Sequence, residues 1–143
     1  MADEIEKSQM EKIKEFIEKC PLLEGGKINV DYLDDEIDSY SIDKTPNQPQ
    51  AYNYIDGYGG KFQINFDFTV TAPLSSQAID NLINSKFCED FMNWIREKNQ
   101  KKEFPDIPGA FSIKCTSQGY MLQKTDTTAI YIIQLAFTYY ELT

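Results

Sequence analysis

The feature that most constrains the fold is an alternation of apolar and polar residues from Lys61 to Thr71. The apolar positions are Phe62, Ile64, Phe66, Phe68 and Val70. The polar positions are Lys61, Gln63, Asn65, Asp67, Thr69 and Thr71. Because successive side chains of a strand point to opposite sides, this pattern predicts a strand with one buried and one solvated side, as in an antiparallel sheet.

Other segments are also typical of strands. We expect them at residues 27–33, 38–43, 111–116, 120–123 and 127–142. Residues 56–60 (DGYGG) predict a hairpin turn between two extended stretches, whereas residues 44–50, with two prolines, predict a loop or an exposed arm. The last strand is apolar on both sides, so we expect it to be central in the sheet or covered by a partner.

Two regions have helical spacing. The first is amphipathic, runs from about Asp3 to Cys20, and should end before Pro21 because proline cannot donate the helical hydrogen bond. The second is expected as two runs, one capped by Ser75 or Ser76 and another following Ser85. The latter carries an apolar stripe that fits a helix lying on a sheet: Phe87, Cys88, Phe91, Trp94 and Ile95.

These patterns predict an α+β fold. At 143 residues, with no repeat or interdomain linker in the sequence, we expect a single domain over residues 1–143. We expect a mainly antiparallel sheet, with an N-terminal helix and a central helical segment packed on one face. Because no apolar run reaches the ~20 residues that span a bilayer, no membrane partner is expected.

The charge is unevenly distributed. The whole chain has a formal net charge of −9, and residues 1–43 contain 13 acidic and 5 basic residues. Tight binding of nucleic acid needs clustered cations, and this chain offers little beyond Arg96, Lys98, Lys101 and Lys102. We therefore expect no sequence-specific nucleic-acid binding, and at most the passage of DNA.

The chain contains no histidine, which excludes Ser-His, Cys-His and His-metal chemistry built from its own residues. Cys20, Cys88 and Cys115 are scattered and are interpreted as reduced, partly buried residues of a cytosolic protein. We accordingly predict no catalytic, cofactor-binding or metal-binding residues. Paired carboxylates and a thiol nucleophile at Cys88 or Cys115 remain the enzymatic alternatives.

Three short motifs partly match known ligand sites. Residues 25–27 (GGK) lack the Ser or Thr of a phosphate-binding loop, and residues 57–60 (GYGG) lack the spacing of a dinucleotide fingerprint. Residues 31–38 are acidic like a calcium loop, but Glu36 stands where that loop needs glycine. Turns and a solvated acidic loop are the better interpretations.

Several strings along the chain carry a family resemblance. They are KIKEFIEKCPLL, GGKINVDYLDDEIDSYSID, YIDGYGGKFQINFDFTVTAP, FCEDFMNWI and SIKCTSQGYMLQKTDTTAIYIIQLAFTYY. In pattern and order the chain resembles phage minor capsid or tail-terminator-like proteins of Firmicutes prophages. Similar sequences often carry the label "chloramphenicol resistance protein". The acetyltransferase that inactivates chloramphenicol uses a histidine base, which this chain lacks.

The resemblance implies a virion structural protein, assembled in the bacterial cytoplasm, that is not an enzyme and has no cofactor. It implies a homo-oligomeric ring, expected to be hexameric, that ends the tail tube and contacts the head-completion proteins. The acidic residues Asp34, Asp35, Glu36 and Asp38 are then candidates for a channel lining or docking surface. The alternatives are a small enzyme, such as an antibiotic-modifying protein, and a host binding module.

Overall fold

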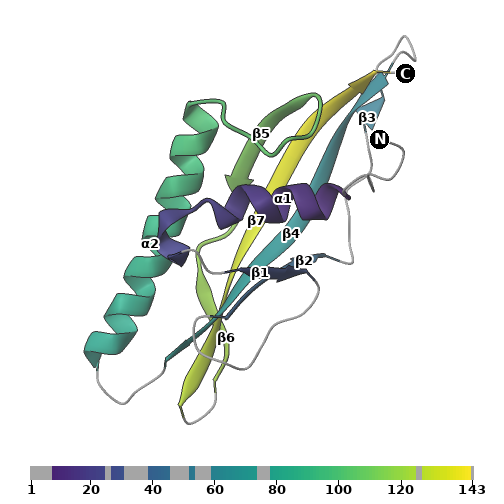
Figure 1. The fold of residues 1–143 in the computed structure, drawn as a ribbon. Coiled ribbons are helices and arrows are strands. Elements are labelled where there is room, and N and C mark those ends of the chain that lie inside the picture. Colours follow the sequence, from purple (N-terminus) through teal and green to yellow (C-terminus); the bar gives the residue numbers. More distant parts are fainter. Residues whose placement is uncertain are drawn as a thin grey trace.

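The computed structural model describes residues 8–24, 27–30, 39–45, 52–53, 59–73, 78–124 and 127–142. The elements along the chain are α1 (Gln9–Glu18), the 3₁₀ helix η1 (Pro21–Leu23), β1 (Ile28–Val30), β2 (Ser39–Lys44), β3 (Tyr52–Asn53), β4 (Gly59–Pro73), α2 (Ala78–Gln100), β5 (Ala110–Cys115), β6 (Tyr120–Lys124) and β7 (Thr128–Leu142). Figure 1 shows the two α-helices packed against one sheet, which confirms the α+β expectation.

The sheet is organised around the two longest strands. β4 and β7 pair antiparallel along their whole lengths, from Gly59 opposite Leu142 to Pro73 opposite Thr128. β2 and β3 pair with the other edge of β4, and β5 and β6 with the other edge of β7. All pairings are antiparallel except that of β1 with β2. β7 is therefore central, as its two apolar sides predicted.

The core lies between the sheet and the helices. The apolar positions of β4 face this side, and Phe66 and Phe68 are fully buried. The Phe68 ring stacks on Phe91 of α2, with centroids 4.4 Å apart. The alternation from Lys61 to Thr71 thus predicted the side that faces the helices correctly, and the strand extends beyond it at both ends. The other side was expected to be solvated, but Thr69 and Thr71 on that side are buried as well.

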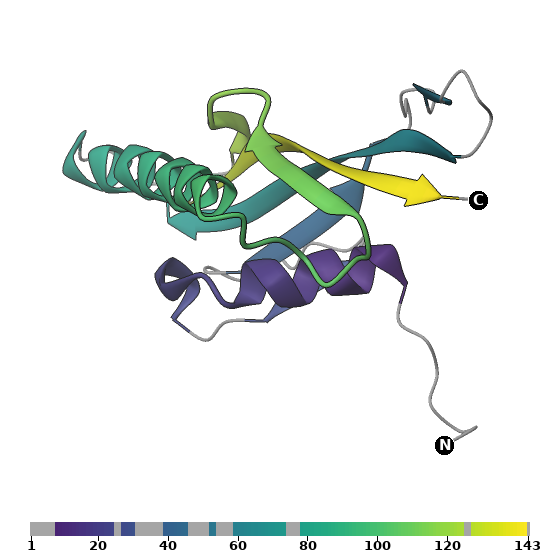
Figure 2. The same cartoon turned by 90° about the horizontal axis from the view of Figure 1, so that it is seen from above.

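Both helices pack on the same side of the sheet. Phe16 of α1 contacts Trp94 of α2, with ring centroids 5.4 Å apart. Ile13 and Ile17, also in α1, are completely buried. Figure 2, seen from above, shows α1 running beside the sheet and α2 extending along it. The apolar stripe around Trp94 is thus part of the core, as expected.

One element was predicted wrongly. The two helical runs expected around Ser85 form a single helix, α2, from Ala78 to Gln100. The interval contains neither glycine nor proline, and the cost of Asn or Ser inside a helix is only a fraction of a kcal/mol. Packing of the C-terminal part of α2 on the sheet offsets that cost.

Other boundaries differ from the expected ones by a few residues. α1 begins at Gln9, where the Ser8 side chain accepts a hydrogen bond from the Glu11 N–H. Gly59 and Gly60, expected in a turn, belong to β4, and Asn53 of β3 pairs with Gly60. The remaining expectations for residues 3–7, 25–26, 31–38, 46–50 and 54–58, and the helix cap expected at Ser75 or Ser76, fall outside the described residues.

Candidate functional site

The sequence-predicted acidic candidates cannot be placed against the fold. Asp34, Asp35, Glu36 and Asp38 lie in residues 31–38, outside the described part of the chain. The segment joins β1 to β2, which are neighbouring parallel strands. Two other features of the described residues are candidate binding sites: a pocket beside α2, and the side of the sheet away from the helices.

The pocket depends on an interruption between β5 and β6. Four residues separate Cys115 from Tyr120, whereas only two separate their partners on β7, Leu135 and Ile132. The extra residues form a bulge, and this bulge still provides hydrogen-bond partners for the backbone N–H and carbonyl groups of Gln134 in β7. The Gln134 carbonyl accepts from the Thr116 N–H at 2.8 Å, and the Gln134 N–H donates to the Ser117 hydroxyl at 3.3 Å.

This bulge packs directly on α2. A Cβ placed on Gly119 would lie 2.8 Å from both Cβ and Sγ of Cys88, so only glycine fits without displacement. Beside this contact is a pocket of about 390 Å³. Its lining comes from α2, the bulge and β7: Ser85, Cys88, Glu89, Met92, Asn93, Arg96, Gln118, Gly119 and Tyr131.

The pocket offers polar contacts but an inert thiol. Arg96 donates to the Asn93 side-chain oxygen at 2.9 Å and remains exposed at the rim. Burial raises the pKa of Cys88 to about 11, and the nearby Glu89 carboxylate acts in the same direction. Burial likewise raises the pKa of Cys115 to about 12, against the opposing effect of Arg96. Both thiols are free and stay protonated at neutral pH, which makes them poor nucleophiles.

The second feature, here called the open face, is the side of the sheet opposite the helices. No helix of the described residues covers it. The residues on this side are Lys61, Gln63, Asn65, Asp67, Thr69 and Thr71 of β4 and Ile130, Ile132, Gln134, Ala136, Thr138 and Tyr140 of β7. Of these, Thr69, Thr71, Ile132, Ala136 and Thr138 are buried. β2 adds Ser41 and Asp43, and the β5–β6 edge adds Phe111, Lys114 and Tyr120.

One end of the open face is acidic. Asp43 and Asp67 are directly opposite each other in the register of β2 and β4. Burial, together with the Asp43 charge, raises the pKa of Asp67. Among the described residues, Asp67 Oδ1 is buried without a hydrogen-bond partner, while the Ser41 hydroxyl donates to Asp43 Oδ1 at 3.2 Å. Two carboxylates are therefore neighbours at this end of the sheet.

The other end is aromatic and basic. The rings of Phe111 and Tyr140 stack with centroids 4.2 Å apart, and the Lys61 ammonium lies 5.5 Å from the Phe111 centroid. Tyr140 is 41% exposed, and Tyr120, near the acidic end, is 43% exposed. Exposed aromatic rings on a sheet are typical anchors of protein interfaces.

The sequence predicted which residues of β4 point to each side of the sheet, but it did not predict which residues of different elements come together. The alternation assigned Asp67 to the polar side, yet only the pairing register shows that it faces Asp43. Gly119 and Cys88 are 31 positions apart in the sequence, and no local pattern connects them. A helix stripe containing a small residue such as Cys88 was the one available sign of a close approach.

Neither metal ligands nor known relatives identify the site. Within the described residues, no group of three or more Asp, Glu or Cys side chains could hold a metal ion, and no described helix is long and apolar enough to span a membrane. No protein-family model matches the chain, and a search of curated proteins returned no relative.

Proposed function

We propose that this protein is a structural subunit of a phage or prophage particle. In this role it forms a ring that ends the tail tube or joins the tail to the head. The single observation that supports this proposal best is the open face. One side of the sheet is backed by both helices, while the other carries exposed Tyr120 and Tyr140. A sheet of this kind is suited to assembly with other chains.

The sequence resemblance is the basis for the kind of assembly that we propose. It covers almost the whole chain and implies a hexameric ring in contact with the tube and with head-completion proteins. The fold expected from that resemblance, an antiparallel sheet with helices on one side, matches the fold of this chain. That agreement is at the level of fold class, so the tail-end role is a proposal tested by assembly.

The test is to add the purified chain to assembling tail-tube protein. We expect tubes to become shorter and to carry ring density at one end in electron micrographs, and native mass spectrometry to reveal the ring's copy number. Tubes of unchanged length without end density would contradict the proposal. A monomer in isolation would not decide the matter, because such a ring can require its tube as a template.

A matched pair of variants links the effect to the open face. Tyr120→Ser removes an aromatic ring from this face, whereas Met121→Ser changes the next residue, which is 40% exposed and pairs with Tyr131 of the opposite side. We expect the first variant to weaken capping of tubes and the second to leave it close to wild type. Equal loss in both variants would count against the open face as the assembly surface.

An antibiotic-modifying enzyme is the alternative, and the pocket beside α2 is where it would act. With a pKa of about 11, only about 1 in 10⁴ Cys88 thiols is ionised at pH 7. We therefore expect no acetylated product when the protein is incubated with chloramphenicol and acetyl-CoA. Turnover detected by mass spectrometry would favour the enzyme over the structural subunit.

A further inference from the structure

The strand β6 lies at an edge of the sheet. It pairs antiparallel with β7, and no described strand pairs with its other edge. Its first two residues, Tyr120 and Met121, point to opposite sides of the sheet, and both are exposed. An exposed edge strand presents backbone N–H and carbonyl groups that can pair with the backbone of another chain.

Two other edge strands are closed by side chains of the helices. The Ile28 N–H of β1 donates to the Glu18 carboxylate at 2.9 Å, and the Ile113 N–H of β5 donates to the Asn99 side-chain oxygen at 3.0 Å. Among the described residues, no helix side chain makes such a bond to the start of β6. The β6 edge is therefore the better place for an added strand.

The pocket beside α2 borders this edge. Gly119, which immediately precedes β6, and Tyr131, which is opposite Met121, both line the pocket of about 390 Å³. The buried Cys88 and the half-buried Met92 of α2 add apolar atoms to the lining. A strand placed along the β6 edge would direct every second side chain to the side of the sheet on which this pocket lies.

The direction of α2 relates the two ends of the pocket to the direction of an added strand. Cys88 lies against Gly119, just before β6, whereas Arg96 is about 12 Å further along α2 and affects the pKa of Cys115 at the end of β5. α2 therefore runs opposite to the path from β5 to β6 (Figure 1). A strand that pairs antiparallel with β6 runs in the direction of α2, so its C-terminal end points toward Arg96.

The bulge between β5 and β6 limits the length of such a strand. Because residues 116–119 interrupt the edge, pairing must stop where β6 begins. At that point the exposed Arg96 stands at the rim of the pocket, where it donates one hydrogen bond to Asn93 and keeps further N–H donors. A guanidinium group with free donors is well suited to bind a carboxylate.

We propose that the β6 edge and the pocket beside α2 bind the C-terminal tail of another protein. The tail adds to the sheet as an antiparallel strand, places an apolar side chain in the pocket and binds its terminal carboxylate to Arg96. Backbone pairing and a side-chain pocket are the usual basis of affinity and specificity in strand addition. Glu89, at the other end of the pocket, disfavours an acidic residue further upstream in the tail because like charges repel.

The first experiment screens the purified chain against short synthetic peptides of randomised sequence. One library has a free C-terminal carboxylate, and a matched library has a C-terminal amide. We expect binders in the first library, with an apolar residue near the C-terminus, and few or none in the second. An absence of binders with a free carboxylate, or equal binding from both libraries, would overturn the proposal.

A matched pair of variants tests the role of Arg96. We expect Arg96→Gln to weaken binding of the best free-carboxylate peptide by at least about tenfold, because a charge-assisted hydrogen bond is lost. Lys101→Gln, in the exposed turn after α2, changes the net charge equally and should bind like the wild type. The amidated form of the same peptide should bind Arg96→Gln and the wild type equally. An equal loss of binding in both variants would contradict the assignment of Arg96.

Hydrogen exchange tests the position of the bound peptide. We expect backbone amides of β6 to exchange more slowly when the peptide is bound, whereas the Ile28 amide in β1 should be unchanged. Protection at β1 without protection at β6 would overturn the proposed site. The binding site does not depend on the tail-end role, so its failure would leave the tube-capping assay unaffected.

Discussion

At the scale of single residues, two positions affect the stability of the fold: Gly109 through its backbone conformation, and Asp67 through the raised pKa of its carboxyl group. Gly109 has φ +81°, a conformation that other residues rarely adopt, and its carbonyl accepts from the Tyr140 N–H at 2.9 Å. A Cβ at this position would lie 1.9 Å from the Tyr140 carbonyl oxygen. The loop after α2 therefore reaches the end of β7 only because residue 109 has no side chain.

We expect Gly109→Ala to destabilise the protein by at least about 3 kcal/mol, since backbone strain and the clash with a backbone atom combine. Urea unfolding monitored by Trp94 fluorescence measures this change. Pro108→Ala, at the exposed neighbouring position, is the control and should alter the free energy of unfolding far less. A Gly109→Ala protein of wild-type stability would show that the loop does not approach β7 as described.

Asp67 makes stability depend on pH. Because its pKa is raised in the folded state by burial and by Asp43, folding is favoured while Asp67 is protonated. This contribution is present below the ordinary carboxyl pKa of about 4 and is lost as the pH rises through the raised value. Ionisation of Asp67 therefore costs stability at neutral pH.

Replacing Asp67 should remove this dependence. We expect Asp67→Asn to be more stable than the wild type at about pH 7, by less than about 1 kcal/mol because the site is partly solvated, and the difference to vanish near pH 4. Thermal unfolding at both pH values measures the effect. Asp106→Asn, in an exposed bend, should show no such difference. A loss of stability at neutral pH in Asp67→Asn would contradict the assignment.

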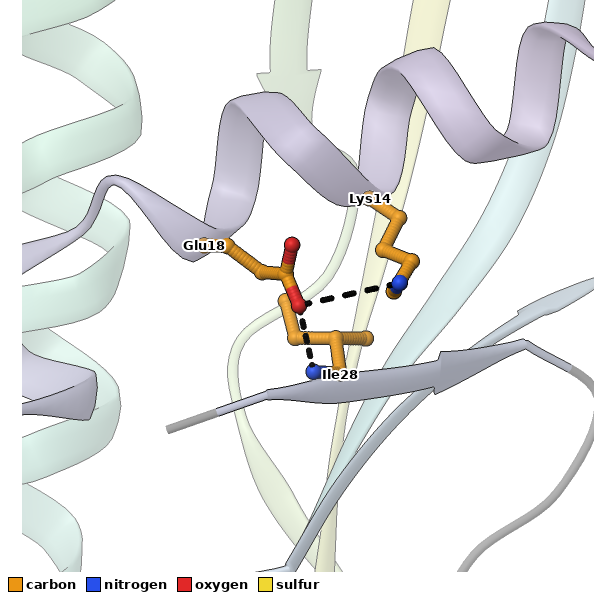
Figure 3. Close-up of polar contacts among 3 residues, drawn as sticks. All are labelled: Lys14, Glu18 and Ile28. Carbon is orange, nitrogen blue, oxygen red and sulfur yellow. Dashed lines mark hydrogen bonds and ion pairs between the residues drawn. The ribbon is translucent and has the colours of Figure 1, made fainter. Parts of the chain in front are cut away.

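At the scale of elements, β1 is a three-residue strand attached to the sheet edge by its parallel pairing with β2. A second attachment comes from α1, where the Glu18 carboxylate accepts the Ile28 N–H at 2.9 Å (Figure 3). Lys14, one helical turn earlier, lies 3.9 Å from the same carboxylate oxygen. A side chain of α1 thus supplies a hydrogen bond that a neighbouring strand would otherwise provide.

We expect Glu18→Ala to cost about 1.5–3 kcal/mol, the usual value of a hydrogen bond to a charged group, and Glu18→Gln to cost less because the amide oxygen still accepts. Hydrogen exchange of the Ile28 amide should accelerate in parallel. Lys14→Met is the matched control, since a partly exposed ion pair at this spacing contributes only about 0.5 kcal/mol or less. Unchanged exchange at Ile28 in Glu18→Ala would refute the role of this contact.

At the scale of the whole molecule, the negative charge is concentrated in one segment of the sequence. Most of the net charge of −9 belongs to residues 1–43, which include the candidate cluster Asp34, Asp35, Glu36 and Asp38. If the protein forms a ring through which DNA passes, an acidic lining would keep the duplex from adhering, because like charges repel. Such a lining extends the proposed function and is tested on the phage.

We expect simultaneous Asp34→Asn, Asp35→Asn, Glu36→Gln and Asp38→Asn to leave folding intact but to slow DNA passage and lower infectivity. Circular dichroism checks the fold, and plaque counts with DNA-ejection kinetics check function. The control neutralises four exposed acids of the described surface: Glu11, Glu89, Glu97 and Asp106. Unchanged infectivity in the first variant, or equal loss in both, would remove the idea of an acidic channel.

The sequence by itself determined which side of β4 and of α2 faces the core. The alternation around Phe66 and the stripe around Phe91 encode the inner sides of β4 and α2, because the backbone repeats of about 2 and 3.6 residues project side chains in fixed directions. The central position of β7 followed from the same reasoning applied to its two apolar sides. These are local properties, and they are retained in the folded chain.

Only the tertiary structure decided how those elements meet. The register that sets Asp43 against Asp67, the parallel pairing of β1 with β2 and the contact of Gly119 with Cys88 all join residues distant in sequence. The continuity of α2 across Ser85 belongs to the same class, since the sequence there neither forces nor prevents a break and packing on the sheet decides between them. Such features depend on the relative positions of packed elements, which no short segment encodes.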